Sequence, residues 1–213
     1  MICETPTRTM RADALKRSFD VVGAVLALLF FAPLILFAVV YIYATMGRPF
    51  LFRQQRTGRH GRSFQVWKFR TMREGCDLPD AARLTPAGLL LRRWSIDELP
   101  QLFNVLCGDM SLVGPRPLLP EYVAYYNPVQ RTRLDVKPGI TGWAQVHGRN
   151  ALSWQRKLRL DAWYVQHRSN LLDLAILIQT VRTVLSREGI SADGHATATR
   201  FYSHLPLEGS TPQ

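Results

Sequence analysis

Two adjacent carboxylates, Asp97 and Glu98, are the residues of this chain best suited to chemistry. An ionised carboxylate can attack an electrophilic phosphorus and form a covalent intermediate. One or two carboxylates together with substrate phosphates are also common ligands of Mg²⁺ in proteins. A second interpretation needs no chemistry: Ser95 and Glu98 have the spacing of a helix capping box, and Asp97 would favour the positive end of the helix dipole. The two interpretations are compatible, and the sequence leaves both open.

Basic side chains elsewhere are candidates for binding phosphate. Arg116 stands between Pro115 and Pro117, which restrict the backbone on either side and therefore the direction of the guanidinium. Arginine can grip a phosphate through two parallel hydrogen bonds. Lys68 and Arg70 alternate on a possible strand, so both would project from one face and could meet phosphate. Taken singly, each of these could equally be an ordinary surface residue.

The charge balance of the chain indicates an anionic partner. The 213 residues carry a formal net charge of +11, with a pI near 10.2. This suits nucleic acid, a lipid headgroup surface or a phosphorylated substrate. Three cysteines without CxxC spacing argue against a disulfide framework and against a zinc site. The sequence has no P-loop, GxGxxG, GxSxG or HExxH motif, so it gives no sign of the reaction classes that depend on them.

An uncharged segment, residues 21–47, is long enough to enter a bilayer, whose core takes roughly 20 apolar residues as a straight helix. Basic residues flank it on both sides, Lys16 and Arg17 before it and Arg48 after it, which indicates that both ends are cytoplasmic. Pro33 lies near the middle and can bend a helix back toward the face it entered. A re-entrant helix-break-helix that dips into one leaflet satisfies both observations. A single-pass helix with a mild proline kink is the alternative that physics alone leaves open.

The rest of the chain is predicted to alternate helices, a hairpin and irregular segments. Basic and aromatic residues mix between positions 48 and 73 around a turn signal at residues 58–61. This pattern predicts a β-hairpin that faces lipid headgroups rather than a nucleic-acid groove. The predicted helices cover residues 89–106 in two pieces, 151–167 and 171–185, and the predicted irregular segments cover residues 108–120 and 137–150.

These elements predict an α+β fold: a mostly helical cytoplasmic domain with a small β-hairpin and an N-terminal re-entrant membrane helix. The predicted division of the chain has four parts. They are a disordered N-terminus at residues 1–13, the membrane helix-break-helix at 14–47, a membrane-associated catalytic domain at 48–200 and a C-terminal tail at 201–213.

Several sequence blocks in a fixed order carry a family resemblance. They are Lys16-Arg17 through Asp20, Lys68-Phe69-Arg70-Thr71-Met72, Ser95 through Leu106, Gly108 through Pro117, and Lys137 through Val146. Several independent blocks in the right order make chance an implausible explanation. The chain resembles the monotopic phosphoglycosyl transferases, the bacterial sugar transferases that initiate exopolysaccharide, O-antigen and glycoprotein glycan assembly.

This resemblance implies a reaction and a set of roles. Asp97 would be the nucleophile that attacks the β-phosphorus of a UDP-sugar and releases UMP, and Glu98 would be its partner carboxylate. Mg²⁺ would be held beside the dyad through Asp97, and Arg92 and Arg116 would bind phosphate. The acceptor would be undecaprenyl phosphate, reached at the cytoplasmic face of the bacterial inner membrane by a protein whose membrane helix is re-entrant. The chain could also form a homo-oligomer.

Two positions depart from the family pattern. His147 stands where the glycine-rich segment usually has Asn, a change that bears on substrate recognition, and Ala32 stands where Ser often precedes the hairpin proline, a change that we expect to be tolerated. The stretch Ser191 through His195 resembles the exopolysaccharide branch and implies a hexose-1-phosphate such as that of galactose or glucose. The competing hypothesis is a membrane-anchored basic protein that binds lipid or nucleic acid without catalysis, in which Asp97 only caps a helix.

Overall fold

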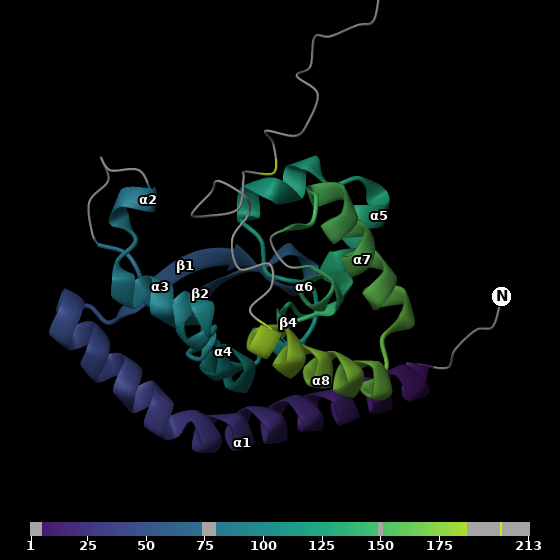
Figure 1. Cartoon of the computed structure of the whole chain (residues 1–213). Coiled ribbons are helices and arrows are strands. Elements are labelled where there is room, and N and C mark those ends of the chain that lie inside the picture. Colours follow the sequence, from purple (N-terminus) through teal and green to yellow (C-terminus); the bar gives the residue numbers. More distant parts are fainter. Residues whose placement is uncertain (1–5, 74–79, 149–150, 187–200, 202–213) are drawn as a thin grey trace, which may run out of the picture.

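A single long helix, α1 (Pro6–Met46), underlies the rest of the protein in the computed structural model (Figure 1). The structure describes residues 6–73, 80–148, 151–186 and 201. Figure 1 shows that α1 bends near its middle and follows the underside of the domain. Pro33 lies inside this helix, where a proline removes a backbone donor and favours a bend. The segment is therefore bent but continuous, which differs from the predicted helix-break-helix.

The helix also begins earlier than the sequence indicates. Residues 1–13 are predicted to be disordered, yet α1 includes residues 6–13. Proline is tolerated in the first turn of a helix, and no glycine or further proline follows Pro6 until the apolar run has begun. The helix therefore extends backward from its apolar part, and the prediction of disorder is wrong for this stretch.

Both ends of α1 are tied to the same domain. Just before its apolar run, Asp20 accepts a hydrogen bond from the Leu112 amide at 3.0 Å. At its far end, Arg70 donates hydrogen bonds to the carbonyl oxygens of Met46 and Gly47. A straight helix that crossed a bilayer could meet a domain on one side of the membrane only at one of its ends. The bend lets both ends of α1 reach one domain.

Most of the apolar surface of α1 faces away from the domain. The helix contains a span, Asp13–Met46, with the length and composition of a membrane helix. The most apolar 18-residue stretch of this span has a mean hydropathy of 2.9, and 11% of it is buried. The exposed large apolar side chains of α1 are Leu15, Val22, Val25, Leu26, Leu29, Phe30, Leu36, Phe37, Val40 and Tyr43. An apolar surface of this extent indicates contact with lipid.

The predicted β-hairpin is confirmed. β1 (Leu51–Thr57) and β2 (Ser63–Phe69) pair antiparallel along their whole length, and the 3₁₀ turn η1 (Arg59–Gly61) lies between them. Val66 and Phe69 on β2 are buried in two different apolar clusters. The hairpin therefore covers the helices that follow it.

The helical segment predicted at residues 89–106 is interrupted as expected. Its elements and the preceding short helix are α2 (Asp80–Arg83), α3 (Pro86–Arg93), the 3₁₀ turn η2 (Ile96–Glu98) and α4 (Gln101–Cys107). Thr85 caps α3 by accepting a hydrogen bond from the Gly88 amide at 2.9 Å. Gly108 ends α4 with a φ of 93°, a conformation that glycine adopts without a Cβ penalty.

The segments predicted to be irregular contain a small parallel sheet. β3 (Ser111–Val113) pairs with β4 (Gly139–Thr141). Glycine permits this approach of backbones, because a Cβ on Gly139 would lie 2.1 Å from the Gly114 nitrogen. Strands of three residues are too short to show a hydrophobic alternation, so the sequence did not predict them. The other short elements are η3 (Pro120–Tyr125), α5 (Pro128–Arg131), η4 (Thr132–Asp135) and α6 (Trp143–Val146).

Two longer helices complete the described chain. α7 (Trp154–His167) and α8 (Asn170–Ser186) agree with the two helices predicted there. Figure 1 shows α8 beside the first half of α1, where Lys16 pairs with Asp173 at 3.1 Å. The predicted α+β class, mostly helical with a small hairpin and an N-terminal membrane helix, is confirmed.

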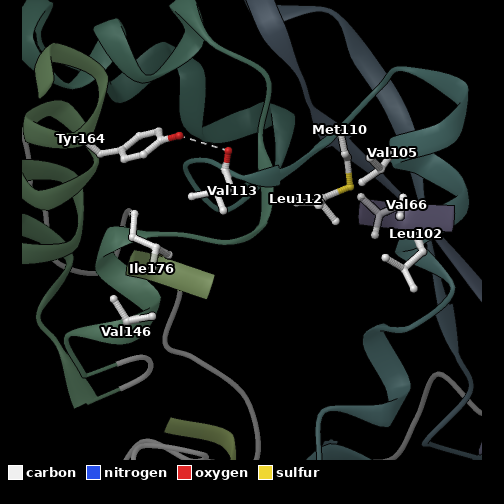
Figure 2. Packing of buried hydrophobic residues seen from close by; sticks show 10 residues of the cluster. Val66, Leu102, Val105, Met110, Leu112, Val113, Val146, Tyr164 and Ile176 are labelled. Atoms are coloured by element: carbon white, nitrogen blue, oxygen red, sulfur yellow. Dashed lines mark hydrogen bonds between the residues drawn. The ribbon is translucent and has the colours of Figure 1, made fainter. Parts of the chain in front are cut away.

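Apolar clusters join these elements into one body. The largest contains apolar residues from α1, β2, α4, β3, α7 and α8, and in it Tyr164 on α7 donates a hydrogen bond to the Val113 carbonyl at 3.2 Å (Figure 2). A second cluster joins Ala38 in the second half of α1 to Leu91 on α3 and Ile96 on η2. Because Ile96 directly precedes Asp97 and Glu98, the membrane helix packs against the segment that carries both carboxylates.

Candidate active site

Asp97 and Glu98 lie on η2, between α3 and α4. Ser95, just before this turn, has a left-handed backbone with a φ of 56°, a conformation that is uncommon for residues other than glycine. Its side chain makes no capping hydrogen bond. The predicted capping box is therefore wrong, and the two carboxylates are available for other interactions.

Glu98 is held by two cations from distant parts of the chain. Lys68 Nζ on β2 and Arg116 Nη2 in the loop after β3 each lie 2.7 Å from Glu98 Oε1. Burial alone would raise the pKa of Glu98, but the charges and hydrogen bonds of Arg116 and Lys68 outweigh it and hold that pKa well below its usual range. Glu98 is therefore ionised at neutral pH and fixes the positions of the two cations.

Asp97 is in a different environment although it is the next residue. Its side chain is buried, and no hydrogen bond reaches it from any of the residues that the structure describes. Burial raises the pKa of Asp97 and the charge of Glu98 raises it further, while Lys68, Arg92 and Arg116 oppose both. The carboxylate thus lies among cations without being bound to one of them. A poorly solvated, unpaired carboxylate with a perturbed pKa is a candidate nucleophile.

Arg92 completes the cationic surroundings of Asp97. It projects from the last turn of α3, and its Nε donates a hydrogen bond to Thr71 Oγ1 at 3.1 Å. Its charge lowers the pKa of Asp97. The structure thus brings Lys68, Arg92 and Arg116 to the carboxylate pair, from β2, α3 and the loop after β3. Their binding of phosphate stays a prediction.

Arg70 lies outside this group. Its side chain is buried and donates hydrogen bonds to the carbonyl oxygens of Met46, Gly47 and Arg48, where α1 ends. The prediction placed Lys68 and Arg70 on one face of a strand, but β2 ends at Phe69, so the alternation stops before Arg70. A guanidinium that satisfies the last carbonyls of a helix is not free to grip a substrate phosphate. The phosphate contact of Arg70 stays a prediction, and these hydrogen bonds do not favour it.

A buried ion pair, Arg133 with Asp161, supports the backbone of Arg116, and the sequence did not indicate it. Arg133 on η4 donates hydrogen bonds to the Arg116 carbonyl at 2.7 Å and to the Tyr126 hydroxyl at 2.8 Å, and it pairs with Asp161 on α7 at 2.9 Å. Arg133 and Asp161 are far apart in the sequence, in an irregular segment and in a helix. Neither stands in a recognisable motif, so only the fold reveals that they meet.

Mg²⁺, which the family resemblance implies, is compatible with these side chains. No group of three His, Cys, Asp or Glu side chains that could hold a metal occurs in the described part of the chain. Glu98 is engaged by two cations, whereas Asp97 keeps an unpaired carboxylate. Because Mg²⁺ is usually bound by one or two carboxylates plus substrate phosphates, Asp97 and a diphosphate form an adequate donor set.

The two departures from the family pattern have distinct surroundings. His147 follows α6, where its Nδ1 lies 2.8 Å from the Trp143 carbonyl oxygen and its ring centroid lies 4.0 Å from that of Trp143. Ala32 lies within the continuous helix α1, so the helix forms without Ser at that position. The stretch 191–195, which suggested the exopolysaccharide branch, lies outside the described residues.

The known proteins that this chain resembles in sequence are named as sugar or sugar-phosphate transferases. The chain is 53% identical over 192 residues to the sugar transferase EpsL of Bacillus subtilis, covering 88% of this chain and 95% of that protein. It is 41% identical over 198 residues to the UDP-glucose:undecaprenyl-phosphate glucose-1-phosphate transferase of Caulobacter vibrioides, covering 86% of this chain and 74% of that protein. It is 38% identical over 197 residues to the undecaprenyl-phosphate galactose phosphotransferase of Salmonella typhimurium, of which it spans 41%.

The family comparison decides between the two hypotheses that the sequence left in competition. The family model described as bacterial sugar transferase matches residues 11–187, which include most of α1, the hairpin, the carboxylate pair and the three cations around it. The alternative, a membrane-anchored binding protein without catalysis, is therefore not supported. The chain belongs to the bacterial sugar transferase family and is an enzyme.

Proposed function

We propose that this enzyme transfers a hexose-1-phosphate from a UDP-sugar to undecaprenyl phosphate through a phosphosugar ester on Asp97. Relatives are named for moving galactose, N-acetylgalactosamine or glucose phosphate to undecaprenyl phosphate. The observation that carries the proposal is the unpaired, buried carboxylate of Asp97 within a group of three cations. In the competing view of a helix cap, that carboxylate would bind backbone amides.

The proposed reaction consists of two displacements at one phosphorus atom. In the first, an Asp97 oxygen bonds to the β-phosphorus, and the bond from that phosphorus to the bridging oxygen breaks, so UMP leaves with the electron pair. In the second, an oxygen of the lipid phosphate bonds to the same phosphorus and the Asp97 carboxylate is released. The products are UMP and a lipid diphosphate sugar. Covalent capture divides one transfer between two bulky substrates into two separate steps.

The chain's own cations would stabilise the charge that moves during these steps. Lys68 and Arg116 are already fixed by Glu98, so they require little reorganisation when the substrate arrives. Arg92 approaches Asp97 from α3. When bound, Mg²⁺ would supply further neutralisation of the phosphate oxygens. Glu98 is engaged by two cations and would therefore position them, leaving Asp97 as the nucleophile.

The attachment of α1 supports a re-entrant position in the membrane. Asp20 and Arg70 tie the two ends of the helix to one domain, and the exposed apolar residues lie on the other side. We infer that the helix enters and leaves the same leaflet, with the domain on the cytoplasmic face of the inner membrane. A nucleotide sugar in solution and a lipid phosphate in the bilayer could then reach the same carboxylate. A homo-oligomer stays a separate prediction.

The test is a UMP-release assay on protein in nanodiscs with Mg²⁺, undecaprenyl phosphate and a panel of UDP-sugars. We expect one sugar to support release and Asp97→Asn to abolish it while the protein remains folded and membrane-bound. Without the acceptor, the wild-type enzyme should retain the sugar phosphate as a mass increase on the peptide that contains Asp97. Near wild-type turnover by Asp97→Asn would eliminate the covalent mechanism.

A further inference from the structure

Two more basic side chains lie near Arg116 and belong to no part of the mechanism described above. Arg56 is on β1 and Lys157 is on α7, and both are half-buried. The family blocks in the sequence did not include either residue. Their positions suggest that the cationic site extends beyond Asp97.

Backbone contacts place β1 next to the loop that carries Arg116. The Thr57 amide donates a hydrogen bond to the Leu118 carbonyl at 2.9 Å, which joins the end of β1 to this loop. Arg56 directly precedes Thr57. Its guanidinium donates one hydrogen bond, to Gln54 Oε1 at 2.5 Å, and lies within 4.0 Å of no carboxylate in the described part of the chain. It is therefore a half-buried cation that makes no direct ion pair within the described residues, although the charge of Glu98 still acts on it.

Lys157 reaches the same region from α7. Asp161, one helical turn further along α7, pairs with Arg133, which in turn donates a hydrogen bond to the Arg116 carbonyl. Residues four positions apart share a helix face, so Lys157 lies on the side of α7 that faces this loop. Its ammonium lies 5.1 Å from the centre of the Trp154 ring and, among the described residues, forms no ion pair.

Electrostatics agree with this placement. Burial and the charge of Arg116 lower the pKa of Arg56 to about 10. Burial and the charge of Arg116 likewise lower the pKa of Lys157. The strongest charge effects on Asp97 come instead from Glu98, Lys68, Arg92 and Arg116. Arg116 is thus the cation whose charge acts on Asp97, on Arg56 and on Lys157 alike.

We propose that Arg56 and Lys157, together with Arg116, bind the second phosphate of the donor, the one that departs with the nucleoside. A nucleoside diphosphate sugar has two linked anionic groups, and a site that binds it requires two adjacent cationic positions. The phosphorus that reacts would lie at Asp97, and the departing phosphate would lie on the far side of Arg116. This assignment rests on the proposed function, because it takes a diphosphate donor and Asp97 as given.

The proposal separates donor effects from acceptor effects. Arg56→Gln and Lys157→Met should each raise the KM for the UDP-sugar and the inhibition constant of UMP by about tenfold, the typical effect of losing one charge-assisted hydrogen bond. The KM for undecaprenyl phosphate should change less than about twofold, since the lipid phosphate makes no contact with this subsite. Arg56→Lys and Lys157→Arg should recover much of the donor affinity.

Matched controls are available on the same two elements. Arg53→Gln removes a cation from β1 whose guanidinium lies 5.6 Å from the Trp67 ring centre, and Arg159→Gln removes an exposed cation from α7. Both should leave the donor KM unchanged. A donor KM that is unaffected by Arg56→Gln and Lys157→Met, or a rise in the acceptor KM alone, would overturn the assignment.

Direct binding of UDP separates this proposal from the proposed function. Calorimetric titration of UDP into wild type, Arg56→Gln and Lys157→Met needs no turnover. If the wild type turns over no UDP-sugar yet the variants bind UDP more weakly, the proposed function fails and the subsite stands. If the wild type turns over and all three proteins bind UDP equally, the subsite is wrong and the function stands.

Discussion

Removing the Asp161 carboxylate should destabilise the domain by about 3–5 kcal/mol, the usual cost of breaking a buried ion pair from one side. Only 4% of the Arg133 side chain and 5% of the Asp161 side chain are exposed, and 2.9 Å separates their charged atoms. In Asp161→Ala the guanidinium remains buried, next to the Tyr126 hydroxyl, without a counter-ion. Asp161→Asn should cost less, because an amide oxygen can still accept the hydrogen bond.

Asp161→Ala should also weaken catalysis, because it affects the position of Arg116. Arg133 donates a hydrogen bond to the Arg116 carbonyl at 2.7 Å, and Arg116 in turn binds Glu98. When Arg133 loses Asp161, it is drawn toward water and this support is loosened. We therefore expect Asp161→Ala to lower kcat in the protein that remains folded and membrane-bound, and Asp161→Asn, which keeps an acceptor for Arg133, to lower it less.

The assay is denaturant unfolding in nanodiscs followed by tryptophan fluorescence. Glu121→Ala, which removes an exposed carboxylate, is the matched control and should change the free energy of unfolding by less than about 0.5 kcal/mol. The double variant Arg133→Met with Asp161→Leu should recover most of the lost stability, since apolar replacement of a buried pair is often neutral or stabilising. A loss below about 1 kcal/mol in Asp161→Ala, a size typical of exposed pairs, would refute the reasoning.

Three further predictions concern pH, packing and topology. Burial and the charge of Glu98 raise the pKa of Asp97, so activity should fall at acidic pH as Asp97 becomes protonated. Glu98→Gln removes that negative neighbour and lowers the pKa of Asp97, so the acidic limb of the kcat/KM profile should move to lower pH. Gly88→Ala should destabilise the protein by about 1–3 kcal/mol in the same unfolding assay, because its Cβ would lie 1.9 Å from the Thr71 carbonyl oxygen, whereas exposed Leu90→Ala should have little effect. Single cysteines placed before and after the apolar segment of α1 should react with a label from the same side of sealed vesicles. Pro33→Leu should favour a spanning helix, in which the two cysteines react from opposite sides. Opposite-side labelling without the Pro33 substitution would contradict the re-entrant helix.

Local patterns predicted much of the fold. The hairpin, the interruption between α3 and α4, and helices α7 and α8 each depend on residues close together in the sequence, and each appears where it was expected. Other features depend on long-range packing. The parallel pairing of β3 with β4 has too few residues for a periodic signal. The hydrogen bonds of Arg70 to the carbonyls at the end of α1 depend on where that helix ends in the folded chain, which the sequence does not show.

The candidate site shows the same division. Motifs indicated Asp97, Glu98 and Arg116, because these residues lie in short blocks of recognisable composition. Spacing could not distinguish a capping box from an active site, since Ser95, Asp97 and Glu98 satisfy both patterns. The left-handed conformation of Ser95 and the 2.7 Å contacts of Glu98 with Lys68 and Arg116 argue against the capping box, and the catalytic role of the pair stays a prediction.

The packing of α1 connects membrane position to the geometry of the site. Ala38 and Ile42 on the second half of α1 share an apolar cluster with Leu91 and Ile96, and Ile96 directly precedes Asp97. Interiors are close-packed, so a change in the bend of α1 would shift these contacts rather than be absorbed by empty space. The same helix that is exposed to lipid therefore also sets the position of the carboxylate pair. This arrangement would hold Asp97 at a defined depth relative to the bilayer, as transfer of a phosphosugar from a soluble donor to a lipid phosphate requires.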